Sequence, residues 1–422
     1  MKRIEELYNG RIHDIRLNTS YPLSPTDWIR YQTIGSLPFC EDEILSFYLH
    51  IPFCRQLCSF CEYTRMRCPS ETAQRAYLET LENDIDKFLE SHPNITLNGF
   101  DIGGGTPTSL TEGSFSRLLD IYWGVLERTS QTDDFEPSIE GTFQTVTQEK
   151  LRKIADAGIK RLSLGIQTSD RKILARHGRK DSDVDRMLAI MEEARKVGIQ
   201  KINLDLMYGL DGQTVDAVIR DIQLLRQLSP EQITLYELRP NMLRYAISQT
   251  KEERYQAYAM YYDALTGLGY FAKFGQNTFS SEKDDLGLSS YLRHRMLACS
   301  PYRGFGISAQ SMNALGICYN KYKNHPSQSI DLSGASYENE TFYRLPSIEL
   351  LNKYIAISAY YGGFSLKIAS NMIGTDAEKY FQQEMDFCLS EGLVTKDNDT
   401  IRITPKGFFN YGAVFSLFYL RE

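Results

Sequence analysis

The stretch FYLHIPFCRQLCSFCEYTR, residues 47–65, joins an apolar run that predicts a buried strand to three closely spaced cysteines. The chain has 422 residues and 8 cysteines, and Cys54, Cys58 and Cys61 follow one another in a CxxxCxxC spacing. A disulfide framework is typical of short secreted chains, whereas the remaining cysteines of this long chain are scattered. The spacing therefore predicts a thiolate-ligated metal site in a reducing compartment.

Three thiolates on one tight loop can hold three corners of a cubane iron–sulfur cluster. Four thiolates are usual for a closed electron-transfer cluster, so three leave one iron open for a further ligand. Zinc is the alternative metal, but zinc sites favour paired CxxC arms or cysteine with histidine, and the sequence has no second arm nearby. A third interpretation is three unligated cysteines beside a core strand.

Apolar, β-rich runs recur along the first 240 residues, with segments of helical periodicity between them. The predicted strands are 47–53, 99–107, 138–143, 161–168, 201–210 and 232–238, and the clearest predicted helices are 73–90, 147–157, 184–198 and 214–227. Alternation of this kind favours an α/β fold with parallel strands and right-handed crossovers. Both candidates, an open doubly wound sheet and a barrel, bind ligands at the carboxyl ends of their strands.

Unusual residues gather at those predicted strand ends: Cys54–Cys61, Gly103–Thr108, Glu140, Gln167 and Asp205. Consecutive glycines let the backbone approach a ligand closely, and their N–H and C=O groups can bind an amino or carboxylate group. The GxGxxG fingerprint of dinucleotide sites is absent. The strand ends therefore predict one ligand site that is shared by several strands.

The pattern changes from about residue 245, and residues 347–418 read as a small α+β tail with a winged-helix-like signature over 385–407. We expect a packing module, because acids outnumber bases between 367 and 407 and the chain has a net charge of -7, whereas duplex binding needs a basic face. The predicted division is 1–43, an N-terminal extension; 44–245, the core; 246–346, an extension with substrate-site loops; and 347–422, a C-terminal module.

The location follows from what the sequence lacks. No run approaches the roughly 18–20 apolar residues of a membrane span. The N-terminal residues contain neither an apolar h-region nor a small-residue cleavage site. We therefore expect a cytoplasmic protein that does not bind membranes.

YLHIPFCRQLCSFCEY followed by GGGTPTSL resembles the radical S-adenosylmethionine (SAM) superfamily. Within this superfamily, the sequence resembles the HemN-like branch, which is related to oxygen-independent coproporphyrinogen III oxidase. SLGIQT, LDLMYGLDGQT, YRGFGISAQS and ITPKG follow in the family order, so the resemblance covers roughly residues 44–415. It implies a partial (β/α)6 TIM-like barrel with a C-terminal winged-helix-like HemN-type module.

The resemblance also implies roles. Cys54, Cys58 and Cys61 would hold a [4Fe–4S] cluster whose open iron chelates the amino and carboxylate groups of SAM. The cofactor would be contacted by a set drawn from four strand ends: Gly103, Gly104, Gly105, Thr106, Glu140, Gln167, Arg179 and Asp205. Tyr48 matches a tyrosine beside the cluster and is the predicted catalytic residue. The alternatives are a strand cap for Gln167, a solvated charge for Arg179 and an internal ion pair for Asp205.

The implied chemistry starts when the reduced cluster donates one electron to the sulfonium of SAM. This yields methionine and a 5′-deoxyadenosyl radical, which takes hydrogen from a substrate or from the methyl group of a second SAM. The expected partners are a small-molecule substrate and a reductant such as flavodoxin or ferredoxin. Nucleic acid is not expected.

Several residues depart from the family pattern. Tyr63 stands where coproporphyrinogen oxidases carry a further cysteine, and SYLRHRMLACSPYRGFG (290–306) lacks the HNxxYW stretch of the heme chaperones. Asp211 replaces a proline. We therefore predict a specialised enzyme, a radical methyltransferase or alkylating enzyme that uses a second SAM. The alternatives are oxidative decarboxylation of coproporphyrinogen III and a heme-binding chaperone.

Overall fold

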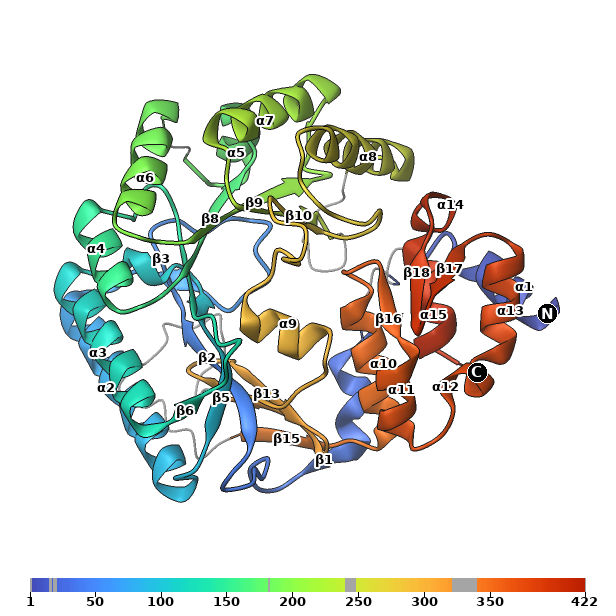
Figure 1. Cartoon of the computed structure of the whole chain (residues 1–422), viewed down its shortest axis with the longest axis horizontal. Coiled ribbons are helices and arrows are strands. Elements are labelled where there is room, and N and C mark those ends of the chain that lie inside the picture. The colour runs from blue at the N-terminus through green and yellow to red at the C-terminus, as the bar shows by residue number, and fades with distance from the viewer. Residues whose placement is uncertain are drawn as a thin grey trace.

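The computed structural model of the chain describes residues 2–14, 17, 21–180, 183–239, 248–320 and 340–421. At its centre, parallel strands lie side by side in the order β2-β5-β7-β8-β9-β10 (Figure 1). Their bounds are β2 Ile44–Ile51, β5 Thr96–Gly104, β7 Ser138–Gly141, β8 Arg161–Gln167, β9 Lys201–Tyr208 and β10 Gln232–Glu237. Each predicted strand is present, which confirms the α/β fold with a parallel sheet.

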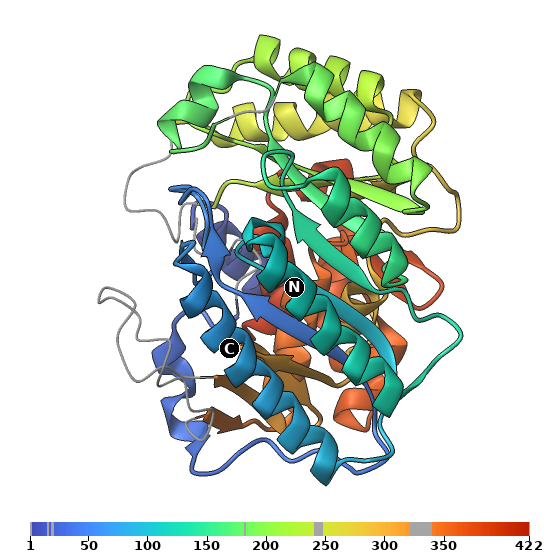
Figure 2. The ribbon, with the colours of Figure 1, turned by 90° about the vertical axis from the view of Figure 1, so that its left-hand side faces the viewer.

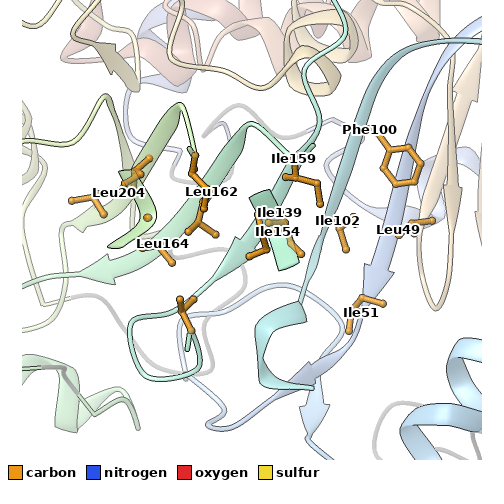
Figure 3. Close-up of a cluster of buried hydrophobic side chains, with 14 of the residues drawn as sticks. Leu49, Ile51, Phe100, Ile102, Ile139, Ile154, Ile159, Leu162, Leu164 and Leu204 are labelled. Atoms are coloured by element: carbon orange, nitrogen blue, oxygen red, sulfur yellow. The ribbon is translucent and has the colours of Figure 1, made fainter. Parts of the chain in front are cut away.

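Alternation along these strands separates two faces. Residues of one parity are apolar and point to the helices, where Leu49, Ile102, Ile139 and Leu162 are almost fully buried (Figure 3). Residues of the other parity are small or polar and face the inside of the barrel. Successive side chains of a strand point to opposite faces, so each strand supplies both the core and the inner wall.

The crossover helices cover the outer side of the strands (Figure 1). They are α2 Glu71–Ser91, α3 Glu112–Arg128, α4 Gln148–Asp156, α5 Arg171–Arg176, α6 Val184–Lys196, α7 Val215–Leu228 and α8 Lys251–Gly267. Side-chain oxygens of Ser70, Thr111 and Thr147 cap the first turns of α2, α3 and α4. Figure 2 shows α2 and α3 side by side on this outer face.

Further strands extend the sheet beyond the barrel strands at both edges. On one side β12 Tyr302–Phe305 runs parallel to β2, and β13 Gln310–Asn313, β14 Gly316–Asn320, β15 Glu340–Arg344 and β1 Gln32–Thr33 continue antiparallel. On the other side β11 Thr278–Ser280 pairs antiparallel with β10. Within the described residues the two edges of the sheet do not pair, so the barrel is partial, as predicted.

The C-terminal part has an apolar cluster of its own. It contains α10 Ser347–Ser358, β16 Gly363–Ser365, α11 Leu366–Ile373, α12 Ala377–Tyr380, α13 Gln382–Ser390, β17 Val394–Asp397, β18 Thr400–Ile403, α14 Pro405–Phe408 and α15 Tyr411–Tyr419. Its sheet has the order β16-β18-β17, and the helix, strand, turn and strand predicted over 385–407 are present. The N-terminal helix α1 Lys2–Arg11 packs on α13 and α15.

The N-terminal segment is tied to this C-terminal part by one buried carboxylate. Glu349 on α10 accepts hydrogen bonds from Trp28 Nε1 at 3.3 Å and Tyr31 Oη at 3.0 Å. Both donors belong to the short 3-10 helix Pro25–Tyr31. The predicted division into four segments stays a prediction, and its boundary at 245 lies outside the described residues.

The remaining short elements are β3 Phe53–Cys54, β4 Met66–Arg67, β6 Ser130–Gln131, the 3-10 helix Pro107–Ser109 and α9 Ser290–Met296. In Figure 1, α9 lies on the inner side of the arc of strands. Among the helices that the structure describes, none combines the length and apolarity that a bilayer crossing demands.

Candidate active site

A cavity of about 700 Å³ opens at the carboxyl ends of the parallel strands. Its size falls in the range of small-molecule sites. The inner wall comes from alternate strand residues: Asp101, Ser138, Glu140, Arg161, Ser163, Asn203, Asp205 and Thr234. Most of these were missed in the sequence, although the alternation in SIEG, RLSLGIQ and KINLDLMY was the signal that could have found them.

The cysteine loop forms one rim of this cavity, and Cys54, Cys58 and Cys61 all line it. Cys54 ends β3, and the Cys61 N–H donates to the Cys58 carbonyl at 3.3 Å, which makes the second half of the loop a tight turn. The Arg65 guanidinium donates to the same carbonyl at 2.6 Å. The Ser59 N–H donates to the His177 carbonyl at 3.1 Å, which ties the loop to the segment after α5.

The chemistry of these donors fits an iron–sulfur cluster. Burial raises the pKa of the Cys54 thiol to about 11, and burial also raises that of Cys61, so metal binding must displace the thiol protons. No group of three or more metal-ligating side chains in the described residues converges on a single ion. A cubane cluster binds each thiolate at a different iron, so its ligands need not converge on one point.

The glycine run at the end of β5 is packed against its surroundings rather than open on all sides. A Cβ at Gly103 would lie 2.6 Å from Glu140 Cδ, and one at Gly105 would lie 2.7 Å from the Pro52 carbonyl carbon. Gly104 has φ +108, and its N–H donates to Glu140 Oε2 at 3.2 Å. Thr106 Oγ1 lies 3.6 Å from Cys54 Sγ. The run therefore brings backbone N–H groups, the Glu140 carboxylate and the Cys54 thiol together.

Three acids share the inner wall with one deeply buried arginine, Arg161. Burial, and then repulsion by Asp205 and Asp101, raises the pKa of Glu140 to about 8. Burial raises the pKa of Asp101 to about 7, and it also raises that of Asp205. Arg161 is held by Gln232 Oε1 at 2.6 Å and Ser138 Oγ at 3.1 Å. Glu140 and Asp101 are therefore substantially protonated near neutral pH.

The predicted residues Gln167, Arg179 and Asp205 all line the cavity. Gln167 has φ +72, an uncommon value for a residue other than glycine. Arg179 donates to the Gly165 carbonyl and lies 3.8 Å from Cys58 Sγ, so it reaches the cysteine loop. Asp205 accepts from Ser163 Oγ and Asn203 Nδ2, each at 2.8 Å.

Tyr48 lies behind the cavity wall and is not among the described residues that line it. Its ring stacks on Tyr291 with centroids 5.6 Å apart. Its hydroxyl lies 3.4 Å from His50 Nδ1, and His50 Nε2 lies 2.8 Å from the Thr64 carbonyl. Burial lowers the pKa of His50 to about 4, so a neutral His50 donates from Nε2 and fixes the end of the cysteine loop.

The wall opposite the cysteine loop comes from later parts of the chain. Leu292, Arg295 and Met296 of α9 line it, together with Ile357 and Tyr360 at the end of α10. Ser358 Oγ donates to the Met296 carbonyl at 2.7 Å, which joins the two helices. The Arg239 guanidinium lies 4.4 Å from the Tyr360 ring centroid. The predicted substrate-site loops over 246–346 include α9, but the sequence did not indicate which of these residues line the cavity.

Known proteins show the same combination of fold and motif. The sequence model described as the Radical SAM superfamily matches residues 48–225, the barrel strands from β2 to β9 with their loops. Residues 48–225 of this chain are therefore a radical SAM domain. Such a domain implies a [4Fe–4S] cluster and SAM, for which the three thiols and the glycine run provide suitable groups.

The relatives are HemN-like. The chain is 34% identical over 193 residues to the heme chaperone HemW of Bacillus subtilis (strain 168), covering 46% of this chain and 50% of the relative. It is 27% identical over 399 residues to HemW of Lactococcus lactis subsp. lactis (strain IL1403), covering 89% of this chain and 98% of the relative. The chain thus aligns with about half the length of the first relative and nearly all of the second.

The solved structure of coproporphyrinogen III oxidase (HemN) from Escherichia coli matches with a TM-score of 0.72 and 22% sequence identity, covering 90% of this chain and 91% of that chain. At this identity the match establishes the fold. The prediction of a HemN-like radical SAM protein is confirmed. The roles predicted for individual site residues stay predictions.

Proposed function

We propose that this protein is a radical SAM enzyme that reductively cleaves SAM and modifies a small molecule in the barrel cavity. The observation that carries the proposal is the meeting of three cysteines, the glycine run and Glu140 at one end of the sheet, beside a cavity of about 700 Å³. The bound cluster and SAM would supply the 5′-deoxyadenosyl radical. A cytoplasmic location and a protein reductant belong to the same proposal.

In this proposal each group of residues has a separate role. Cys54, Cys58 and Cys61 hold the cluster. The Gly103–Thr106 backbone and Glu140 would face the amino end of SAM, where a carboxyl oxygen of Glu140 would accept a hydrogen bond from the amino group. Asp205 is half-buried and accepts hydrogen bonds from two side chains, so it would orient a ligand without moving. Walls from α9 and α10 keep water away from the reacting atoms.

The finer proposal is methyl transfer or alkylation with a second SAM. The support is positional: α9, which carries three wall residues, belongs to the stretch that departs from the heme-chaperone pattern. Tyr63, which replaces the cysteine of the oxidases, also lines the cavity. Both departures therefore line the cavity, where a change of side chain would alter the reaction rather than the fold.

Coproporphyrinogen oxidation and heme chaperoning are the alternatives, since relatives carry those names. Reconstituted protein is incubated anaerobically with dithionite, methyl-deuterated SAM and either coproporphyrinogen III or heme. Deuterium in the tetrapyrrole product supports methyl transfer, and an unlabelled decarboxylated product supports oxidation. Heme binding with no 5′-deoxyadenosine formed under any condition contradicts the enzyme proposal.

A further inference from the structure

Basic residues concentrate around the cysteine loop. The chain as a whole has 47 lysines and arginines against 54 acids. Two short segments, 54–67 and 171–180, reverse this balance and contain one acid, Glu62. Their bases are Arg55, Arg65, Arg67, Arg171, Lys172, Arg176, Arg179 and Lys180.

The two segments are neighbours in space. The Lys180 N–H donates to Gln56 Oε1 at 2.8 Å. Arg55 Nη1 donates to the Gln144 carbonyl at 3.1 Å, and the Gln144 side chain in turn donates to the Lys180 carbonyl. The cysteine loop and the segment after α5 therefore form one continuous surface.

We name four of the exposed bases of this surface the basic rim: Arg55, Lys172, Arg176 and Lys180. Within the described residues, Arg55, Lys172 and Lys180 have no acid at ion-pair distance. Arg176 is 3.9 Å from Asp211, and Asp170 at the start of α5 is held by Arg220 at 2.7 Å. Glu62 is exposed and lies 3.9 Å from Arg239, and Asp183 is exposed beyond the far end. The net sign of the rim is positive.

An apolar side chain lies within this charged surface. Leu57 lies between Cys54 and Cys58 and is 37% exposed. Its carbonyl is 3.1 Å from the position that a Cβ at Gly178 would take, so the loop packs closely on the adjoining segment. A small apolar centre with a polar rim is the anatomy of a transient protein interface.

We propose that the basic rim and Leu57 form the docking surface for an acidic one-electron carrier protein. The inference rests on the proposed function, which requires an electron donor. Opposite charge steers such a carrier to the loop that holds the cluster ligands, and weak electron-transfer complexes need only a small interface. In the transfer the carrier loses one electron and the cluster gains it, with no bond made or broken.

The test compares two donors. Lys172→Glu/Arg176→Glu reverses two rim charges outside the cavity lining, and Lys87→Glu/Lys160→Glu makes the same charge change on exposed residues far from it. Formation of 5′-deoxyadenosine is measured with dithionite and with a reduced flavodoxin over a range of concentrations. We expect the apparent KM for flavodoxin to rise at least about tenfold in the rim variant and not in the control, with dithionite rates unchanged.

A second measurement does not depend on the variants. In the unaltered protein, raising ionic strength should increase the KM for flavodoxin and leave the dithionite rate unchanged. Equal flavodoxin KM in rim and control variants, or no salt dependence, overturns the docking proposal. So does a rim variant that loses affinity for coproporphyrinogen III or heme instead of flavodoxin. If dithionite itself yields no 5′-deoxyadenosine, the proposed function fails rather than the docking surface.

Discussion

The inner wall of the barrel contains several acids, whereas the basic rim consists of lysines and arginines that are exposed to solvent. Asp101, Glu140 and Asp205 lie inside the barrel, where burial raises each pKa. Arg55 and Lys180 lie in contact with bulk water. Inside, desolvation decides the protonation state, so the acids act by short-range hydrogen bonds. Outside, charges stay ionised and act over about a Debye length, so they steer partners.

The largest expected effect is loss of the cluster when a cysteine of the loop, rather than another cysteine, is replaced. Each of Cys54→Ala, Cys58→Ala and Cys61→Ala should leave almost no bound iron and sulfide after anaerobic reconstitution, and no 5′-deoxyadenosine, because three ligands are needed to hold a cluster with one open iron. Exposed Cys40 gives the matched control, Cys40→Ala, with full iron content. Loss of the cluster in Cys68→Ala would show that the ligand assignment is wrong.

The next effect concerns the glycine run. Gly103→Ala places a methyl group against Glu140, whose side chain is flexible and must move away from the Gly104 N–H. We expect the Kd for SAM to rise about 10- to 100-fold, with the iron content unchanged. Gly124→Ala, on an outer helix with open space around its Cβ, is the control for calorimetry. Unchanged SAM affinity in Gly103→Ala would remove Glu140 from the cofactor site.

A smaller expected effect is a pH-dependent change in stability caused by the desolvation of Asp101. Its pKa of about 7 exceeds the usual 3.8, so the folded chain keeps a proton that the unfolded chain loses, and stability falls as pH rises from about 4 to about 7. The loss is at most about 4 kcal/mol, since each pKa unit corresponds to about 1.4 kcal/mol, and cavity water reduces it. Asp101→Asn should therefore gain stability relative to the parent across this window, as denaturant unfolding would show.

Asp134 serves as the control, because its pKa is shifted in the opposite direction from that of Asp101. Burial acts to raise its pKa, but hydrogen bonds from Thr132 and the nearby His294 outweigh burial and lower it. Its ionised form stabilises the fold above the usual pKa, and this stabilisation is lost as pH falls. Asp134→Asn should therefore lose stability at neutral pH. A pH-independent difference between Asp101→Asn and the parent would refute the desolvation argument.

The smallest expected effect is the change in stability when a residue of the basic rim is replaced. Lys180→Ala removes an exposed charge without an ion-pair partner among the described residues, and its backbone hydrogen bond to Gln56 remains. We expect the free energy of unfolding to change by less than about 0.5 kcal/mol in urea. A loss above about 1 kcal/mol would mean that the rim supports the fold and is not reserved for a partner.

The sequence alone determined the strands and their order along the chain, the cysteine loop, the glycine run and Glu140. These features depend on neighbours a few residues apart: the alternation of apolar side chains, the CxxxCxxC spacing and glycines that follow a strand. The predicted end of the third strand placed Glu140 correctly, at the end of the sheet where the carboxyl ends of the parallel strands meet.

Only the tertiary structure decided which polar side chains share the cavity and how they ionise. Asp101 and Arg161 lie on different strands, and the opposite wall uses Arg295 and Tyr360 from much later in the chain. Their proximity results from sheet order and helix packing, which local patterns do not encode. The pKa shifts arise from burial by atoms distant in sequence, so they exist only once the barrel has formed.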